Sequence, residues 1–314
     1  MASLLIAIVT LLVMLVPTVW IVVARPGGRT VWAPRVLLAA ALVTLGFLLG
    51  NWAVLGIWTR IGLAGLFLVA VLVSFVRARR VGRDSAGGGR TSFAITIIAV
   101  VILLVDLAAI ASRIPPAGAV DLAFPFHSGT FVVTQGGRGP LTNPFHFWTP
   151  AEQYGLDLVR VGKLGVRARG VAPKELKEYA TWGEPVFSPC TGRVVDEVSR
   201  TPEAAIGSPD ASVPAGNYVI LDCSGTNVVL AHLKRGAVFV RPGDSVLEGE
   251  RIAKVGNSGY TSEPQLHLSA SRTEGGRQVP VPVRFEGAFL TQNDVVRVEG
   301  ESQQPAIPAA QVPQ

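Results

Sequence analysis

The sequence has little charge and few cysteines. Of its 314 residues, 16% are charged, 49% are hydrophobic and only two are cysteine. Soluble domains carry about 25% charged residues, so this composition argues against a disordered chain and against a wholly soluble one. The chain also lacks GxxxxGKS/T and GxGxxG segments, so it offers no support for a nucleotide-binding domain.

Charge is distributed unevenly along the chain. Residues 1–112 contain nine Arg, no Lys and two acidic residues, whereas residues 113–314 carry a net charge of −1. The overall charge of +6 therefore comes from the first third, where it indicates membrane topology and gives no evidence for nucleic-acid binding. All four His and both Cys follow residue 112, so side-chain chemistry is expected in the second part.

Long apolar segments in the first part predict four membrane-spanning helices, near residues 3–24, 36–53, 57–76 and 91–112. Each is close to the roughly 20 residues that cross the hydrocarbon core of a bilayer. A cleaved signal peptide is the alternative for the first segment, but its start, MASLL, lacks the usual positive charge. We therefore expect a multi-pass anchor.

Arginine lies mainly in the first and third connections between these segments, with three Arg in residues 25–35 and five in residues 77–90. By the positive-inside rule, these connections are cytoplasmic, and both termini and residues 113–314 are outside the cytoplasm of a bacterial cell membrane. Asp106 falls within the fourth segment. We expect it to make a structural hydrogen bond in the bundle, because the other spans contain no Lys, His or carboxylate for a proton path.

Short apolar runs broken by Gly, Pro, Asn and Asp follow residue 121 and predict an all-β domain. One short helix is expected at residues 173–180. Strands are expected at residues 130–134, 156–161, 192–198, 218–222, 227–231, 237–240, 251–255 and 265–270. The chain then divides into a transmembrane region (1–112), a linker (113–129), a β domain (130–300) and a disordered tail (301–314) without apolar periodicity.

The two cysteines, Cys190 and Cys223, would face an oxidising compartment in this topology. That location favours a disulfide between the strands beside them. Two buried free thiols are the alternative. Zinc binding by the pair is not expected, because the chain has no CxxC spacing.

Asp157, His232 and His267 come from three separate predicted strands. Gln265 shares a strand face with His267, because side chains two residues apart point the same way. A catalytic zinc requires about three protein ligands from His, Asp, Glu or Cys, and an open position for water. These residues are therefore the candidates for a cleft that carries metal chemistry.

The stretch from Tyr218 to Ala270 resembles the core of the LytM/lysostaphin-type zinc metallopeptidases, which are peptidoglycan endopeptidases. It contains AHL, a V-x-x-GD-x-V-x-x-G segment, VGNSG and an HxH-like QLH. PVFSPCTGRVVDEV resembles the family's hairpin, and QYGLDLV occupies the position of its HxxxD motif. The resemblance covers about residues 130–270 and implies a LytM-like β-sandwich or open barrel of the hammerhead type, with one Zn²⁺.

The resemblance also implies zinc ligands. Asp157 and His267 match two family ligands, whereas Gln153 stands where the family has its first His ligand. A Gln amide is a neutral and weak zinc ligand. His146, in the preceding Asn143-Pro-Phe-His146 segment, is therefore the alternative third ligand.

One of the two catalytic positions is also occupied by Gln in place of His. His232 matches one catalytic His of the family, and Gln265 stands where the other is found. Gln265 can donate a hydrogen bond to an oxyanion but cannot transfer a proton. Loss of general acid–base help typically costs about 10²–10⁴-fold in rate.

Two functions remain open. One is a membrane-anchored, extracytoplasmic zinc metalloendopeptidase that acts on peptidoglycan cross-link peptides, which the retained Asp157, His232 and His267 favour. The other is a catalytically impaired module of the same fold that binds cell wall or regulates hydrolases or the division machinery, which Gln265 favours. A lipoyl-type carrier is less well supported, because Lys254 lacks a hairpin-tip setting.

The expected partners follow from these two parts. They are peptidoglycan peptides and the lipid bilayer. A membrane or cell-wall protein is a further candidate, because four spans exceed what a simple tether needs. We expect no nucleic acid.

Overall fold

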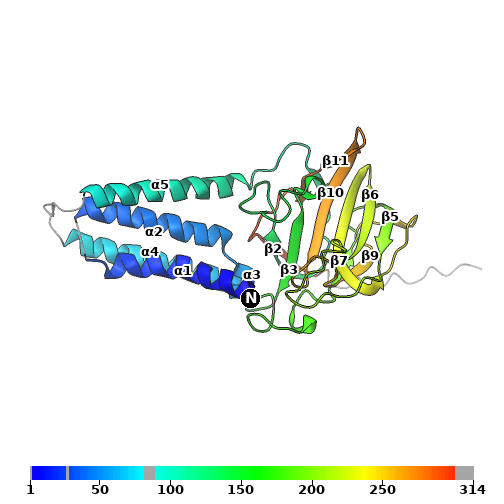
Figure 1. The fold of residues 1–314 in the computed structure, drawn as a ribbon, viewed down its shortest axis with the longest axis horizontal. Helices are drawn as coiled ribbons and strands as arrows, with labels where there is room; N and C mark the ends of the chain where they lie inside the picture. Colours follow the sequence, from blue (N-terminus) through cyan, green and yellow to red (C-terminus); the bar gives the residue numbers. More distant parts are fainter. Residues whose placement is uncertain (1, 26–27, 81–88, 301–314) are drawn as a thin grey trace, which may run out of the picture.

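The computed structural model describes residues 2–25, 28–80 and 89–300, which form a helical bundle followed by a β domain (Figure 1). The helices run side by side along one axis, and the β domain lies at one end of the bundle, with its strands running across that axis (Figure 1). The predicted disordered tail lies outside the described residues.

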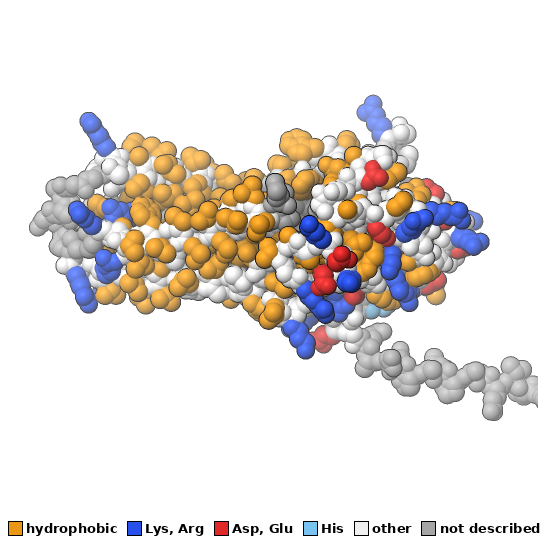
Figure 2. All heavy atoms as spheres, turned by 60° about the horizontal axis from the view of Figure 1, so that its bottom comes forward, with side chains coloured by type: hydrophobic (Ala, Val, Ile, Leu, Met, Phe, Trp, Pro, Cys, Tyr) orange, Lys and Arg blue, Asp and Glu red, His pale blue; other side chains and the backbone are white. Residues whose placement is uncertain are grey.

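Four long helices make up the bundle, which confirms the predicted number of spans. They are α1 (Ala2–Val23), α2 (Arg29–Leu49), α4 (Ile57–Arg79) and α5 (Gly89–Ala111). Their mean hydropathy lies between 1.9 and 2.9, and each is long and apolar enough to cross a membrane. Figure 2 shows hydrophobic side chains over the visible face of the bundle.

The second predicted span was wrong in its position. α2 begins at Arg29 and ends at Leu49, and a separate one-turn helix, α3 (Trp52–Leu55), follows it. Arginine is tolerated in the first turns of a spanning helix, because its long side chain can reach the polar interface. The chain between α2 and α4 therefore turns at Gly50 and Gly56, which flank α3.

The expectation for Asp106 in α5 was also wrong. Its side chain is 2% exposed, as expected for a position inside the bundle. Neither carboxylate oxygen has a hydrogen-bond partner within the described residues, however. The expected structural hydrogen bond is therefore not formed.

The β domain is built on one large sheet, in the order β13-β2-β3-β10-β7-β6-β5-β8, with β4, β9 and β11 attached beside this path. β1 and β12 form a separate parallel pair. The described strands do not close into a barrel, so the predicted β fold takes its open form. The strands are β1 (Val120–Leu122), β2 (Gly129–Gln135), β3 (Leu156–Val161), β4 (Pro185–Phe187), β5 (Gly192–Val198), β6 (Asn217–Cys223), β7 (Thr226–Val238), β8 (Ser245–Val246), β9 (Arg251–Val255), β10 (Leu266–Glu274), β11 (Arg277–Pro280), β12 (Val283–Phe285) and β13 (Val295–Val298).

The predicted strands correspond closely to the observed ones, with β7 forming one long strand where two were expected. The predicted helix at 173–180 was wrong. Only two short 3₁₀ turns are found in the domain, η1 (Pro150–Glu152) and η2 (Leu176–Glu178). The backbone of this segment bonds outside itself instead, because the N–H of Ala180 donates to the carbonyl of Arg167 at 2.9 Å.

Aromatic rings close one side of the domain core. Phe126 stacks on Phe131 with ring centroids 4.1 Å apart, and Phe124 meets Phe285 edge-on at 5.4 Å. Phe124, Phe126 and β1 all fall in the segment predicted as a linker, 113–129. That segment therefore contributes a strand and core side chains to the β domain.

An apolar cluster joins the bundle to the β domain. It contains two residues at the α3–α4 turn and three from the central strands β2 and β3: Ala53, Ile57, Val132, Val159 and Val161. Backbone bonds support it, because the N–H of Ile57 donates to Gly165 O at 3.0 Å and the N–H of Arg167 donates to Ala53 O at 2.8 Å. The α3–α4 end of the bundle is thus packed against β2 and β3.

Asn293 makes a second connection between the two parts. Its Nδ2 donates to the carbonyls of Leu48 and Gly50, each at 2.9 Å, where α2 ends. Its own carbonyl accepts from Nη1 of Arg60 at 2.9 Å. The bonds of Nδ2 satisfy carbonyls that a helix C-terminus leaves without intrahelical partners. Asn293 of the β domain therefore caps the C-terminal end of α2.

A disulfide links Cys190 to Cys223, which confirms the favoured prediction. Cys190 precedes β5 and Cys223 ends β6, and their Cα atoms are 6.0 Å apart. The bond closes a loop across 33 residues of sequence. It reduces the freedom of the unfolded chain around the β5–β6 hairpin.

Reduction should therefore destabilise the β domain. Closing a loop of this length stabilises a domain by about 2–4 kcal/mol, and we expect a lower melting temperature in the presence of a reductant. Thermal unfolding of the full-length protein in detergent measures the shift. A Cys190→Ser/Cys223→Ser variant should already have the lower melting temperature, and reductant should not change it further. An equal shift of the melting temperature by reductant in both proteins would contradict the disulfide.

Candidate metal centre

Three neighbouring strands bring the candidate residues together. Asp157 in β3 is paired across the sheet with His267 in β10. On its other side, His267 is paired with Ala231 of β7, directly before His232. The sheet register therefore places residues separated by up to 110 positions in sequence side by side.

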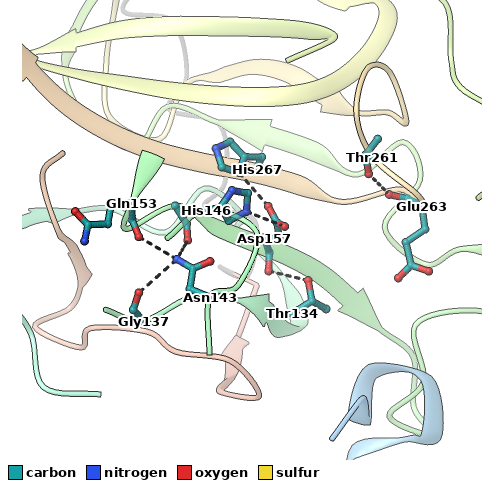
Figure 3. A network of polar contacts seen from close by, with 10 residues as sticks. Thr134, Gly137, Asn143, His146, Gln153, Asp157, Thr261, Glu263 and His267 are labelled. Atoms are coloured by element: carbon teal, nitrogen blue, oxygen red, sulfur yellow. Dashed lines mark hydrogen bonds and ion pairs between the residues drawn. The ribbon is translucent and has the colours of Figure 1, made fainter. Parts of the chain in front are cut away.

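A buried carboxylate lies at the centre of this group. Asp157 is 4% exposed, and its Oδ1 is 2.9 Å from Nδ1 of His267. Its Oδ2 is 3.0 Å from Nε2 of His146. Burial opposes ionisation of this carboxyl, but the charge and hydrogen bonds of His146 and His267 outweigh it and hold the pKa of Asp157 far below its usual range. Figure 3 shows both imidazoles directed at Asp157.

His146 reaches the site from the loop between β2 and η1, and its side chain is 13% exposed. Burial lowers the pKa of His146, but the nearby Asp157 carboxylate raises it more, so the pKa lies above its ordinary value. The adjacent Phe145 and Trp148 are 71% and 74% exposed. Two accessible aromatic rings therefore lie in the same loop as His146.

Asn143 holds the His146 loop in shape. Its Nδ2 lies within hydrogen-bond distance of three carbonyls, those of Gly137 (3.3 Å), Gln153 (3.2 Å) and Gly155 (3.0 Å), as Figure 3 shows. The side chain is completely buried. One amide thus joins the start of the loop to the segment that leads into β3.

Residue 155 must be glycine because two imidazole rings lie close to its Cα. A Cβ at this position would lie 2.8 Å from Cε1 of His267 and 3.2 Å from Cγ of His146. Contacts this short would force the imidazoles to shift. A glycine two residues before Asp157 therefore makes room for both rings.

His232 occupies the third side of the site. Its ring centroid is 6.0 Å from that of His267, and its Nδ1 is 3.0 Å from the carbonyl of Ser258. This contact assigns the proton to Nδ1 and leaves Nε2 as an acceptor. Burial first, and the neighbouring His267 second, lower the pKa of His232 to about 4. His232 is therefore neutral at neutral pH.

The backbone of His232 is unusual for a residue with a Cβ. Its φ is 61°, in the left-handed region. Its N–H donates to Ala215 O at 3.1 Å, and its carbonyl accepts from Gly256 at 3.0 Å. Non-glycine residues hold this conformation only when surrounding contacts impose it, and such positions are frequent in functional sites.

The two glutamines occupy different positions relative to this group. Gln265 is half-buried and directly precedes β10, two residues before His267. Gln153 contributes its backbone carbonyl to the Asn143 contacts. Figure 3 shows the Gln153 amide directed away from His146, Asp157 and His267.

The donor set is compatible with a metal ion. Ligand atoms around a tetrahedral zinc with bonds of about 2.0–2.1 Å lie about 3.3 Å apart. The contacts of Asp157 with His267 and His146, at 2.9 and 3.0 Å, are near that spacing. Nε2 of His267 is buried and lacks a hydrogen-bond partner within the described residues. Unpaired buried imidazole nitrogens are suited to metal ligation.

Sequence reasoning missed Glu152, one residue before Gln153. One ligand atom each from His146, Glu152 and His267 lies within 4.8 Å of the others. Its carboxylate is thus a further candidate ligand, and its acidic character next to Gln153 was the available signal. In the sequence, Asn143 stood out only as part of the segment with His146. Its hydrogen bonds to the carbonyls of the loop depend on tertiary contacts that a sequence does not display.

Several solved peptidase structures are similar to this chain. A zinc-containing peptidase from Vibrio cholerae has 21% identity and a TM-score of 0.30, covering 50% of this chain and 37% of that protein. The catalytic domain of a prophage-encoded M23 protein from Enterococcus faecalis has 20% identity and a TM-score of 0.31, covering 52% of this chain and 95% of that domain. The catalytic domain of lysostaphin from Staphylococcus simulans has 20% identity and a TM-score of 0.26, covering 38% of this chain and 68% of that domain.

This chain spans little more than a third of the Vibrio cholerae protein. No curated protein matches the chain. The model of peptidase family M23 matches residues 177–280, which include His232, Gln265 and His267. Residues 177–280 of this chain therefore form a domain of peptidase family M23.

Proposed function

We propose that this protein is a membrane-anchored zinc metalloendopeptidase that hydrolyses peptide cross-links of peptidoglycan. The observation that carries the proposal is the contact of two imidazoles, His146 and His267, with the two oxygens of one buried carboxylate, Asp157. Family membership of residues 177–280 supports a peptidase-type hydrolase. The substrate class comes from the resemblance to peptidoglycan endopeptidases.

Asp157, His267 and His146 would hold the zinc, with Glu152 close enough to contribute. Bound there, zinc would supply an acidified water and polarise the scissile carbonyl. Two imidazoles and one carboxylate suit a catalytic zinc site that keeps a position open for water. The low pKa of Asp157 keeps this carboxylate ionised and ready to bind a cation.

His232 would act as the general base. With its Nδ1 proton directed at Ser258 O, its Nε2 can accept a proton from the attacking water. Its depressed pKa keeps Nε2 free of a proton at neutral pH. Gln265, two residues before His267, would donate an amide N–H to the oxyanion of the tetrahedral intermediate.

The membrane arrangement fits a cell-wall substrate. The start of α2 and the last turns of α4, which carry Arg35, Arg77 and Arg79, lie at the end of the bundle away from the β domain (Figure 1). The positive-inside rule puts that end in the cytoplasm, so the β domain and both termini face the wall. A disulfide in the β domain is consistent with an oxidising compartment.

Gln265 favours a second candidate function. A module that binds zinc and peptide without efficient turnover would serve to bind cell wall or to regulate hydrolases or division proteins. The two candidate functions differ in the rate of peptide hydrolysis and agree in zinc binding. Measurements of both quantities on the same variants separate them.

Zinc content tests the ligand set. The full-length protein in detergent should bind one Zn²⁺ per chain, and His146→Ala should weaken binding by more than the roughly 10–100-fold that loss of an outer partner costs. Competition with a chromophoric chelator measures this affinity. His127→Ala is the matched control, because His127 is exposed and stacks on Phe187 at 3.6 Å. Unchanged affinity in His146→Ala, with loss in Gln153→Ala, would reverse the assignment.

Peptide release from purified peptidoglycan tests turnover. Wild type should release peptides slowly, Gln265→His should raise kcat/KM by about 10²-fold or more by restoring a proton-transfer group, and His232→Gln should remove activity. Mass spectrometry of the released fragments provides the rates. Activity only in Gln265→His identifies the second candidate, and zinc-loaded protein that stays inactive in both forms argues against either peptidase chemistry or this substrate.

Histidine NMR tests the state of His232. The lowered pKa predicts that its ring stays neutral on acidification from neutral pH and gains a proton only near pH 4. The zinc-free full-length protein, with His232→Gln to identify the signal, provides the titration. A midpoint at or above the ordinary value of about 6.5 would exclude the proposed neutral base.

A further inference from the structure

The β domain exposes three large apolar side chains more fully than any described residue of the spans. Among the described residues, Leu164, Trp148 and Phe145 are the most exposed large hydrophobic side chains, at 78%, 74% and 71%. The most exposed ones in the spanning helices, Leu68 and Phe93, reach 68%. A single apolar residue on a surface needs no explanation, but apolar side chains that gather on one face mark a contact with a membrane or another molecule.

The His146 loop, which carries the two aromatic residues, is bonded to the end of a span. α5 ends at Ala111, and the carbonyl of Ser112 accepts a hydrogen bond from the N–H of Arg138 at 3.1 Å. The hydroxyl groups of Ser112 and Thr142 are also hydrogen-bonded to each other. Thr142 therefore lies where α5 leaves the hydrocarbon core. Phe145 is three residues further on, at most about 10 Å away.

This loop presents different residues to the metal centre and to its surroundings. His146 directs its ring at Asp157, as Figure 3 shows, whereas Phe145 and Trp148 are exposed. The N–H of Thr149 donates to the carbonyl of His146 at 2.9 Å, which turns the chain tightly around Trp148. The two aromatic side chains therefore project from a loop that is held in place at both the metal centre and α5.

A second loop of the β domain, residues 162–166, lies against the start of another span. α4 begins at Ile57, whose N–H donates to Gly165 O at 3.0 Å, and Nε1 of Trp58 donates to Lys163 O at 3.2 Å. The approach is close, because a Cβ on Gly165 would lie 2.5 Å from Cγ1 of Ile57. Leu164 lies between the two bonded residues. Two loops fastened to two spans therefore carry the three most exposed apolar side chains.

These loops continue the surface that the spans present to lipid. Leu107 and Ile110, in the last turns of α5, are exposed, and so is Trp58 in the first turn of α4. Tryptophan is enriched where a bilayer meets water. Lys163 is exposed directly before Leu164, and a lysine in this setting can extend its ammonium group towards headgroups while its methylene stem stays among apolar groups.

We propose that Phe145, Trp148 and Leu164 insert into the headgroup layer of the bilayer, in the leaflet on the side of the β domain. Lipid is the occupant because both loops are bonded to the ends of spans and extend the lipid-facing surface of α4 and α5. Apolar side chains bind at this depth by entering the boundary between headgroups and acyl chains. The contact depends on the spans and is independent of peptidase activity. It would hold the loop that carries His146 against the membrane.

Site-directed fluorescence of the full-length protein in nanodiscs tests this contact. Both cysteines of the chain form the disulfide, so Trp148→Cys, Leu164→Cys and Leu247→Cys can each carry one environment-sensitive NBD label. Leu247 is the matched control, because it is 67% exposed and directly follows β8, which ends the sheet opposite β13. Figure 1 shows β5, the partner of β8, on the side of the domain away from the bundle.

In phosphatidylcholine nanodiscs, the labels at positions 148 and 164 should emit at shorter wavelength, be quenched by doxyl lipid and lose quenching by aqueous iodide. The label at position 247 should be quenched by iodide and unaffected by doxyl lipid. Iodide quenching of all three labels would place the loops in water and overturn the proposal. A shift to shorter wavelength without quenching by doxyl lipid would mean that a second copy or another protein covers the loops, which also overturns it.

A pair of unlabelled variants provides an independent measurement. Brominated phosphatidylcholine should quench less tryptophan emission in Trp148→Phe than in wild type, because one indole in contact with lipid is lost. Trp182→Phe is the matched control. Its ring lies in the β domain, with Nζ of Lys234 at 4.8 Å from the ring centroid, and its loss should leave the quenched emission unchanged. Equal reductions in the two variants would contradict contact between Trp148 and lipid.

Discussion

Two imidazoles share one buried carboxylate, and the rest of the candidate site is arranged around that contact. Removing Asp157 from water is costly unless charge partners compensate it, and His267 and His146 provide that compensation from the neighbouring strand and the preceding loop. The other features serve this geometry. Gly155 leaves room for both rings, and Asn143 fixes the loop that carries His146.

The same strands connect this site to the membrane anchor. Val159 in β3 packs against the α3–α4 turn, and Asp157 is two residues earlier in the same strand. Asn293 and the apolar cluster fasten the β domain to the last residues of α2 and the first residues of α4. A site built on a strand that is packed against the anchor has a defined position relative to the bilayer. That position would restrict the proposed peptidase activity to substrates near the membrane surface.

Much of this architecture could be predicted from the sequence, because its signals are local. Long apolar runs predicted the four spans, and short apolar segments bounded by turn residues predicted most strands, including those that carry Asp157 and His267. The start of α2 was missed because arginine at a helix end does not stop a helix. The helix predicted at 173–180 was wrong because the backbone of this segment forms tertiary hydrogen bonds, which local sequence does not reveal. Whether His146 or Gln153 approaches Asp157 depends on how a loop folds back, which residue spacing alone does not determine.

X-ray absorption spectroscopy of the zinc-loaded, full-length protein tests the central claim most directly. The spectrum reports the number and type of ligand atoms around the metal. The shared contact with Asp157 predicts nitrogen and oxygen ligands only, with two imidazoles, and loss of one imidazole in His146→Ala. A wild-type site with one imidazole, or a spectrum unchanged by His146→Ala, would contradict the account.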